Sequence, residues 1–246
     1  MMKVYGLIGY PLTHSFSQRY FSEKFSQENI QGCTYQNFSI PSMDELPAVL
    51  ATPGLSGLNV TIPYKEAVIP FLDRTDEVVK EIGACNCIRI EDGIKTCYNT
   101  DVIGFERSLL SGLQAHHDKA LVLGTGGAAK AVKWVLKKRG IPFISVSRRP
   151  EPPETLSYAE LTPDLIATHR LIINTTPLGM YPRVDECPPI DFNAVESNHF
   201  LFDLIYNPET TRFLQYGMEK GATTQNGFDM LIHQAEESWK IWNNLI

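Results

Sequence analysis

The stretch Lys119-Ala-Leu-Val-Leu-Gly-Thr-Gly-Gly-Ala-Ala-Lys-Ala-Val-Lys-Trp-Val-Leu-Lys-Lys-Arg-Gly140 decides the fold of this chain. Its pattern predicts an apolar strand over Lys119–Leu123, a tight turn over Gly124–Gly127, and a helix over Ala128–Arg139 that ends at Gly140. Strand, turn and helix in this order and spacing indicate an α/β fold, in which right-handed crossovers join the strands of a parallel sheet.

The residues after this stretch continue the same pattern. Pro152 and Pro153 predict a loop over Glu151–Glu154. Further short strands are predicted at Ile144–Ser147, Arg170–Asn174, His199–Asp203 and Gly221–Thr224. A Rossmann-type parallel sheet is therefore expected in this half of the chain.

The glycine-rich turn has the GxGxxA spacing of a dinucleotide-binding fingerprint. Glycine permits the tight turn and lets the backbone approach a pyrophosphate, whose charge the helix N-terminus then binds. A plain glycine turn between a strand and a helix is the alternative. The predicted cofactor-binding residues of the loop are Gly124, Thr125, Gly126, Gly127 and Ala128.

The end of the next strand carries Ser147, Arg148 and Arg149. A site for NAD usually has an acidic residue there, which holds the ribose 2′-hydroxyl. Two guanidinium groups instead suit a 2′-phosphate, through charge-assisted hydrogen bonds. These residues predict NADP as the cofactor, although a solvated arginine pair on a loop is the alternative.

The first hundred residues also alternate between strand-like and helix-like patterns. Strands are predicted at Val4–Gly9, Thr34–Ile40, Gly57–Thr61, Cys85–Glu91 and Ile94–Asn99, the last two joined by an Asp92-Gly93 hairpin turn. Helices are predicted at Ser17–Asn29, Met43–Ala51, Lys65–Phe71, Thr75–Ile82 and Asp101–Ser111. A long amphipathic helix is predicted at Gly227–Ile246.

Composition limits the classes of function. The 246 residues suffice for two compact domains, and 43% hydrophobic with 20% charged residues is typical of a soluble globular protein. A net charge of −6 disfavours nucleic acid or an anionic membrane as the main partner. Five cysteines without a CxxC pair indicate reduced cytosolic thiols and argue against a disulfide framework or a zinc site, so a cytoplasmic protein is expected. The expected partner is a small molecule, and a monomer or a homodimer is expected.

Polar side chains stand beside turns in His14–Ser17, Asn59–Lys65, Gly83–Asn86 and Asn99–Asp101. Each segment alone is also typical of a helix cap, a turn or a solvated lysine. In their order and spacing, however, they resemble the motifs of the shikimate dehydrogenase family. The resemblance extends over nearly the whole chain, because Asn174–Met180, Asp203–Pro208, Gly227–Leu231 and Gln234 also match family motifs.

The resemblance implies a two-domain enzyme with its active site in the cleft between the domains. Residues 1–102 and 226–246 would bind substrate, and residues 103–225 would bind NADP. The implied reaction is the reversible NADPH-dependent reduction of 3-dehydroshikimate to shikimate, a step of chorismate and aromatic amino-acid biosynthesis.

The resemblance also implies roles for single residues. Ser15 and Ser17 would donate hydrogen bonds to the substrate carboxylate. Lys65 and Asp101 would form the acid–base pair, because an ammonium can stabilise the charge that develops on the carbonyl oxygen and then supply the proton. The other substrate contacts would be Thr61, Asn86, Tyr206 and Gln234, with Asn59 as a further substrate-side group, and the additional cofactor contacts would be Thr175, Leu204 and Gly227.

Some positions depart from the family pattern. Cys87 stands where the family usually has Thr, Ser147 where it has Asn, and Arg149 where it has Thr. The loop after Arg149 lacks the expected helical continuation, and the chain is short for the family. A trimmed nucleotide domain is therefore expected.

Other functions stay open at this point. A relative that also oxidises quinate, with NAD as its cofactor, is the nearest. A non-catalytic sensor of shikimate-like ligands would be expected to lose the acid–base pair, yet Lys65 and Asp101 are both present. A lysine-dependent NADP dehydrogenase acting on folate explains the glycine loop and the lysine but not the Ser15–Ser17 motif.

Overall fold

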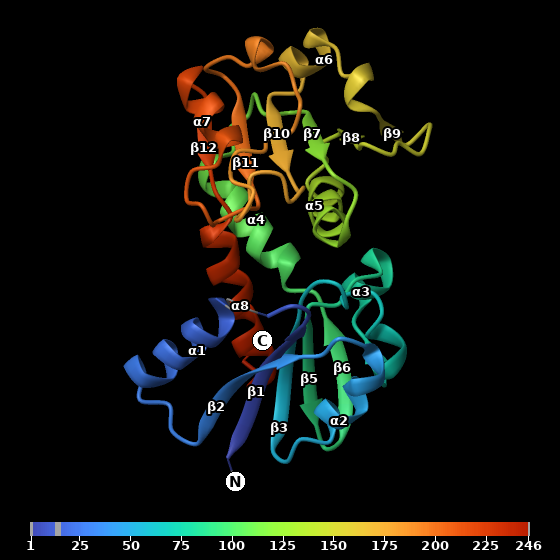
Figure 1. Cartoon of the computed structure of the whole chain (residues 1–246), viewed down its shortest axis with the longest axis vertical. Coiled ribbons are helices and arrows are strands. Elements are labelled where there is room, and N and C mark those ends of the chain that lie inside the picture. The colour runs from blue at the N-terminus through green and yellow to red at the C-terminus, as the bar shows by residue number, and fades with distance from the viewer. Residues whose placement is uncertain (1, 13–15, 246) are drawn as a thin grey trace. The chain divides into compact units, whose positions relative to one another are not determined.

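The computed structural model describes residues 2–12 and 16–245. This part of the chain divides into two compact units, residues 1–100 with 235–246, and residues 101–234 (Figure 1). The second unit is thus one continuous segment, whereas the first is assembled from two separate segments of the chain.

The first unit is built on a mixed sheet with strand order β2–β1–β3–β5–β6–β4. Strand β1 runs parallel to both β2 and β3, whereas β5 runs antiparallel to β3 and β6. The strands are β1 (Lys3–Gly9), β2 (Cys33–Ser39), β3 (Leu55–Val60), β4 (Arg74–Thr75), β5 (Cys87–Glu91) and β6 (Ile94–Tyr98). The pairing of β5 with β6 confirms the predicted hairpin.

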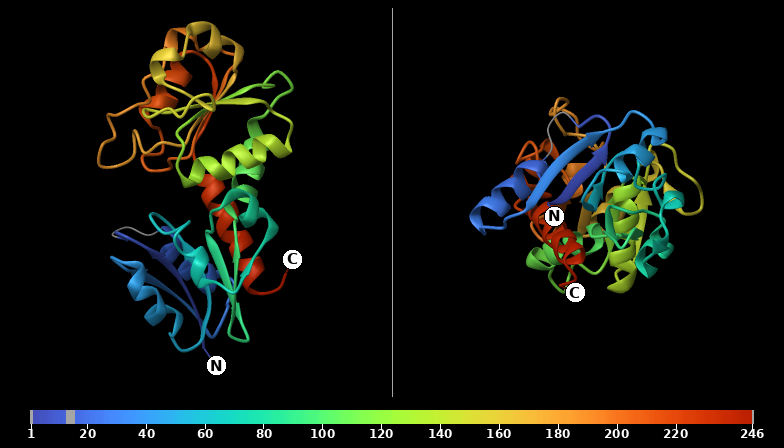
Figure 2. Two further views of the ribbon diagram at one scale, coloured as in Figure 1. Left: turned by 90° about the vertical axis from the view of Figure 1, so that its right-hand side faces the viewer. Right: turned by 90° about the horizontal axis from the view of Figure 1, so that it is seen from below.

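Helices cover both faces of this sheet (Figure 2). On one face, Phe21 of α1 (Phe16–Gln27) and Trp242 of α8 (Phe228–Trp242) pack with Tyr5 and Tyr35 of the strands. The other face packs against α2 (Leu46–Leu50) and α3 (Glu77–Ile82), with the 3₁₀ turns η1 (Met43–Glu45) and η2 (Ile69–Phe71) beside them. Helix α8 contributes to both units, since its residues up to Gln234 belong to the second.

The second unit contains a wholly parallel sheet with strand order β12–β11–β10–β7–β8–β9. Its strands are β7 (Ala120–Leu123), β8 (Phe143–Val146), β9 (Thr155–Leu156), β10 (Leu171–Asn174), β11 (Phe200–Asp203) and β12 (Thr223–Gln225). The predicted α/β class and the predicted parallel sheet are confirmed. The chain progresses from β7 toward β9 on one side and from β10 toward β12 on the other, so the order reverses between β7 and β10.

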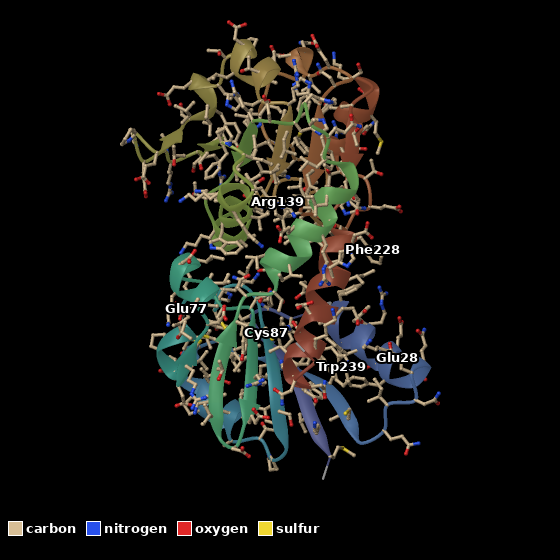
Figure 3. All side chains as sticks on the ribbon, turned by 180° about the vertical axis from the view of Figure 1, so that it is seen from behind. Glu28, Glu77, Cys87, Arg139, Phe228 and Trp239 are labelled. Atoms are coloured by element: carbon tan, nitrogen blue, oxygen red, sulfur yellow. The ribbon has the colours of Figure 1, made fainter. Side chains whose placement is uncertain are left out.

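Helices also cover both faces of the second sheet. Helix α4 (Asp101–Gly112) packs Phe105 against Phe202 of β11, and its Glu106 forms ion pairs with Lys138 and Arg139 at the end of α5 (Gly127–Lys138), where Figure 3 labels Arg139. The opposite face packs against α6 (Pro163–Thr168) and α7 (Arg212–Glu219), beside the 3₁₀ turns η3 (Tyr158–Glu160) and η4 (Phe192–Ala194).

Several predicted elements were wrong in detail. The helix predicted over Lys65–Phe71 is a series of turns ending in η2, because Pro70 has no amide hydrogen and cannot make the hydrogen bond that would continue an α-helix. The helix predicted over Thr75–Ile82 begins only at Glu77, since the Asp76 side chain caps it by accepting from Val78 N. Strands β4 and β9 and helices α6 and α7 were not predicted.

No helix within residues 2–12 and 16–245 is long and apolar enough to cross a membrane. All five cysteines are free thiols. Across the described residues, no group of three or more His, Cys, Asp and Glu side chains gathers in a way that could hold a metal ion.

Candidate active site

The glycine-rich loop lies at the carboxyl end of β7, where the strand order of the second unit reverses. Open parallel sheets bind their ligands at this point, outside the carboxyl ends of the strands. Gly126 is the N-cap of α5, a helix of 12 residues, so the loop leads directly to the positive end of the helix dipole. The loop is therefore placed where a pyrophosphate can bind.

The glycines of the loop fall into two kinds. Gly124 has φ +110°, and a Cβ at this position would lie 2.5 Å from Thr175 Oγ1, so both the backbone and the space require glycine. Thr175 is held there because its N and Oγ1 donate to Leu123 O at 2.9 and 2.7 Å. A Cβ on Gly126 or Gly127, by contrast, would meet no described atom within 4 Å. Their small size keeps the helix N-terminus open to a ligand.

Arg148 and Arg149 follow the carboxyl end of β8 and are exposed. Ser147 shapes this turn, because its Oγ accepts from Arg149 N at 3.2 Å. Burial raises the pKa of Tyr158 to about 12, and the nearby charge of Arg148 partly offsets the rise. The Tyr158 hydroxyl is buried and has no hydrogen-bond partner among the described residues. Since Arg148 and Arg149 are both exposed, the turn after β8 presents two guanidinium groups to solvent at the carboxyl end of this strand.

Leu204 and Gly227 meet at the carboxyl end of β11. A Cβ on Gly227 would lie 2.1 Å from Leu204 O, so no other residue fits without a shift of the backbone. Leu204 N donates to Asn174 O at 3.0 Å, which joins the ends of β10 and β11. The structure therefore brings Gly124, Thr175, Leu204 and Gly227 to one edge of the sheet.

Asp203, the last residue of β11, stabilises this edge of the sheet through hydrogen bonds. Its carboxylate accepts from Asn174 Nδ2 at 3.0 Å, from Ile205 N at 3.0 Å and from Thr211 Oγ1 at 2.6 Å. Burial raises the pKa of Asp203 to about 6, although these hydrogen bonds act to lower it. This role of Asp203 was not predicted from the sequence.

In the first unit, Thr61 and Lys65 lie just after β3. Thr61 N donates to Ile8 O at 2.9 Å, and Tyr64 N donates to Thr61 O at 3.0 Å, so the segment turns back at the sheet edge. Cys85 N donates to Lys65 O at 2.7 Å. This bond brings the Lys65 backbone next to the segment that carries Asn86.

Asn86 is only 3% exposed and is bonded to Thr100. Asn86 Nδ2 donates to Thr100 Oγ1 at 3.0 Å, and Asn86 Oδ1 accepts from Thr100 N at 2.6 Å. Thr100 directly precedes Asp101, which is buried at the start of α4. Ser17 is buried in the first turns of α1, whereas Ser15 lies outside the described residues.

Asn59 is buried, and its side-chain amide hydrogen-bonds other residues of the first unit. Its Oδ1 accepts from Tyr35 Oη at 2.9 Å, and its Nδ2 donates to Ser238 Oγ at 2.9 Å and to Asn86 O at 3.3 Å. No role was predicted for Tyr35 or Ser238 from the sequence. Ser238 follows Gln234 by four residues, so the sequence alone could have placed both on one face of the C-terminal helix.

The remaining predicted substrate residues belong to the second unit. Gln234 is buried on α8, and its Nε2 donates to Leu231 O at 2.9 Å. Tyr206 follows β11 and is 36% exposed. Their roles toward a substrate stay predictions.

Comparison with known proteins gives consistent matches. Residues 7–88 match the family model described as "Shikimate dehydrogenase substrate binding domain". A relative from Carboxydothermus hydrogenoformans, named shikimate dehydrogenase (NADP(+)), is 36% identical over 99% of this chain and 92% of its own length.

Solved structures match the whole fold. Shikimate 5-dehydrogenase from Thermus thermophilus, in complex with NADP(H) and shikimate, aligns with a TM-score of 0.88 at 28% identity, covering 100% of this chain and 95% of that one. Quinate dehydrogenase from Corynebacterium glutamicum, in complex with NAD, aligns with a TM-score of 0.88 at 26% identity, covering 99% and 94%.

Proposed function

The chain belongs to the shikimate dehydrogenase family, and from this membership we propose that it catalyses the reversible NADPH-dependent reduction of 3-dehydroshikimate to shikimate. This step belongs to aromatic amino-acid biosynthesis. The observation that carries the proposal is the 36% identity to an NADP-dependent shikimate dehydrogenase over 99% of the chain, which includes both units.

The second unit is proposed to bind NADP. A Cβ at Gly126 or Gly127 would meet no described atom within 4 Å, so a pyrophosphate would approach the N-terminus of α5 there without a clash with these residues. Arg148 and Arg149 would hold the 2′-phosphate, with Ser147 shaping their turn. The other contacts would come from the loop residues Gly124, Thr125, Gly126, Gly127 and Ala128, and from Thr175, Leu204 and Gly227. NADPH supplies the hydride when bound.

The first unit is proposed to hold the substrate. Ser15 and Ser17 would bind the carboxylate of the substrate, since hydroxyls are good donors to an anion. Thr61 and Asn86 would hydrogen-bond its ring hydroxyls. Asp101, Tyr206 and Gln234, from residues 101–234, would complete the contacts.

Lys65 and Asp101 would carry the proton transfer. The Lys65 ammonium would stabilise the negative charge that develops on the carbonyl oxygen and then donate its proton there. Asp101 would orient the lysine. In the reverse direction the neutral amine would accept the proton of the substrate hydroxyl.

A second candidate function is the oxidation of quinate with NAD. The similarity to a quinate dehydrogenase in complex with NAD supports it. Arg148 and Arg149 favour NADP over NAD, because a 2′-phosphate would pair with them and a 2′-hydroxyl would not. A ligand sensor is disfavoured because both proposed acid–base residues are present.

The decisive measurement is the initial rate of nucleotide reduction with shikimate and with quinate, each with NADP and with NAD. We expect the highest kcat/KM for shikimate with NADP. A preference for quinate with NAD would replace the leading function with the second one, and the absence of turnover on either compound would favour a sensor.

We further propose that the enzyme acts in the cytoplasm, where free thiols such as its five cysteines stay reduced. We expect a monomer or a homodimer, which sedimentation of the purified protein would distinguish.

A further inference from the structure

A chain of buried hydrogen bonds runs through the first unit and connects segments that carry the proposed substrate residues. Tyr35 Oη donates to Asn59 Oδ1 at 2.9 Å, and Asn59 Nδ2 donates to Ser238 Oγ at 2.9 Å. Ser238 Oγ lies 3.2 Å from Thr100 Oγ1. Thr100 is in turn bonded to Asn86 through both its Oγ1 and its N. The bonds thus tie β2, β3 and α8 to the segments at Asn86 and Thr100.

The hydrogen bonds are continuous from Tyr35 to Asn86. Asn86 Nδ2 donates to Thr100 Oγ1 at 3.0 Å, and Thr100 Oγ1 lies 3.3 Å from Asn86 Oδ1. Between Ser238 and Thr100 either hydroxyl can be the donor. Connected hydrogen bonds polarise one another, and the loss of one leaves buried groups unsatisfied.

Both ends of this chain reach proposed substrate residues. Ser17 hydrogen-bonds the Tyr35 hydroxyl; burial raises the pKa of Tyr35 and the bond from Ser17 partly offsets the rise. At the other end, Asn86 is a proposed ligand of the ring hydroxyls, and Thr100 is followed directly by Asp101. Ser238 lies one helical turn after Gln234 on α8.

The members of the chain are enclosed by the core. Ser238 is 0% exposed, and Asn59, Asn86 and Thr100 are between 1% and 4% exposed. The Tyr35 ring stacks on Phe21 with centroids 4.7 Å apart and planes inclined by 13°. Figure 3 labels Trp239 on α8, the residue that follows Ser238 in this helix. A rotation of any one member would therefore break bonds that water cannot replace.

We propose that Tyr35 and Ser238 are positioning residues for the substrate, which set the orientation of Ser17 and Asn86 through this chain of hydrogen bonds. The inference rests on the proposed function, because Ser17 and Asn86 are substrate ligands only under it. Tyr35 and Ser238 themselves would not touch the substrate.

Tyr35→Phe is the main test, because it removes one hydroxyl and keeps the ring that stacks on Phe21. The matched control is Tyr5→Phe in the same aromatic core, where the lost hydroxyl bonds only weakly to Asn243, at 3.5 Å, and lies outside the chain. We expect Tyr35→Phe to raise the KM for shikimate about five- to tenfold, while the KM for NADP changes less than about twofold. The control should change neither KM, although both variants lose a buried hydroxyl.

Ser238→Ala gives a second, independent measurement at the centre of the chain. We expect the same rise in the KM for shikimate, and the double variant Tyr35→Phe/Ser238→Ala should be little worse than either single variant, because both interrupt one chain. A KM for shikimate that follows the Tyr5→Phe control in both single variants would overturn the inference. A wild-type protein without turnover of shikimate would overturn the proposed function, and this inference with it, so the two failures are distinct.

Discussion

Lys65 is the residue on which the proposed proton transfer depends. We expect Lys65→Ala to lower kcat about 10²- to 10⁴-fold, the range that general acid catalysis contributes, while the KM for shikimate changes less. Steady-state kinetics measures both parameters. Lys80→Ala, at an exposed lysine of the same unit, is the control and should keep both near their wild-type values. A normal kcat with only a raised KM would show that Lys65 binds substrate without transferring a proton.

Asp203 gives the second unit a dependence on pH. Its pKa is about 6 in the folded state and near 3.8 when unfolded, so the folded state holds the proton more tightly between these values. The free energy of unfolding should therefore fall as pH rises from about 4 to about 6, by at most about 1.4 kcal/mol per pH unit from this group. Above pH 6 this contribution stays constant.

Denaturant unfolding at several pH values measures this fall. Asp203→Asn cannot titrate, so its curve should lack this slope even though the variant is less stable at every pH. A slope that survives in Asp203→Asn would assign the dependence to another group.

Asn59 shows the limit of reading roles from single residues. It stands in a motif with Thr61 and Lys65, and this predicted a substrate-side group. Both ends of its amide are bonded to Tyr35 and Ser238 in the core. Asn59 lies within β3, whereas Thr61 and Lys65 follow the end of that strand, so neighbours in sequence can have different surroundings.

At the scale of elements, α1 is fastened to α8 by a partly buried ion pair. Lys24 Nζ lies 2.9 Å from Glu236 Oε1 and 2.7 Å from Glu28 Oε1, and the Tyr20 hydroxyl donates to Glu236. Burial raises the pKa of Glu236, but the hydrogen bonds from Tyr20 and Lys24 outweigh it and hold the pKa below its ordinary value. The stability that this carboxylate contributes is therefore present above about pH 4.5 and is lost as the pH falls through its lowered pKa.

We expect Glu236→Gln to lower the free energy of unfolding by about 1–3 kcal/mol at pH 7, because the Lys24 side chain is only 8% exposed and loses one of its counter-charges. Urea unfolding measures the change. Glu23→Gln on the exposed side of α1 is the matched control and should change it by less than about 0.5 kcal/mol. Equal effects of the two substitutions would contradict a special role for the pair.

The elements that the sequence predicted well have strong local signals. The stretch Lys119–Gly140 carries an apolar run, glycines and a helical period, and the structure has β7 and α5 there. Strands β4 and β9 have two residues each, which is too short for a period to be seen. The hydrogen bonds among Tyr35, Asn59 and Ser238 join residues far apart in sequence, so only the three-dimensional structure reveals them.

At the scale of the whole molecule, each unit has its own sheet and its own core, and the proposed phosphate contacts of NADP all belong to the second unit. We expect NADP to slow amide hydrogen exchange at residues 127–129, because the first amides of a helix have no acceptor within the helix. The same should hold at 147–149 if the arginines bind the 2′-phosphate. Mass spectrometry after exchange measures this.

NAD is the matched comparison, since it lacks only the 2′-phosphate. It should protect residues 127–129 and leave 147–149 nearly unchanged. Shikimate should instead protect peptides around Thr61 and Asn86. Equal protection of 147–149 by both nucleotides would place the arginines away from the phosphate.

The discontinuous first unit has a consequence for how the protein is made. Its core needs Ile241 and Trp242 of α8, while residues 101–234 carry the whole of the second sheet. The second unit, as one continuous segment, can therefore complete its folding without residues 1–100. The first unit leaves the apolar residues of β1 and α1 uncovered until α8 is available, so during synthesis its N-terminal segment is exposed to aggregation and is a candidate for chaperone binding.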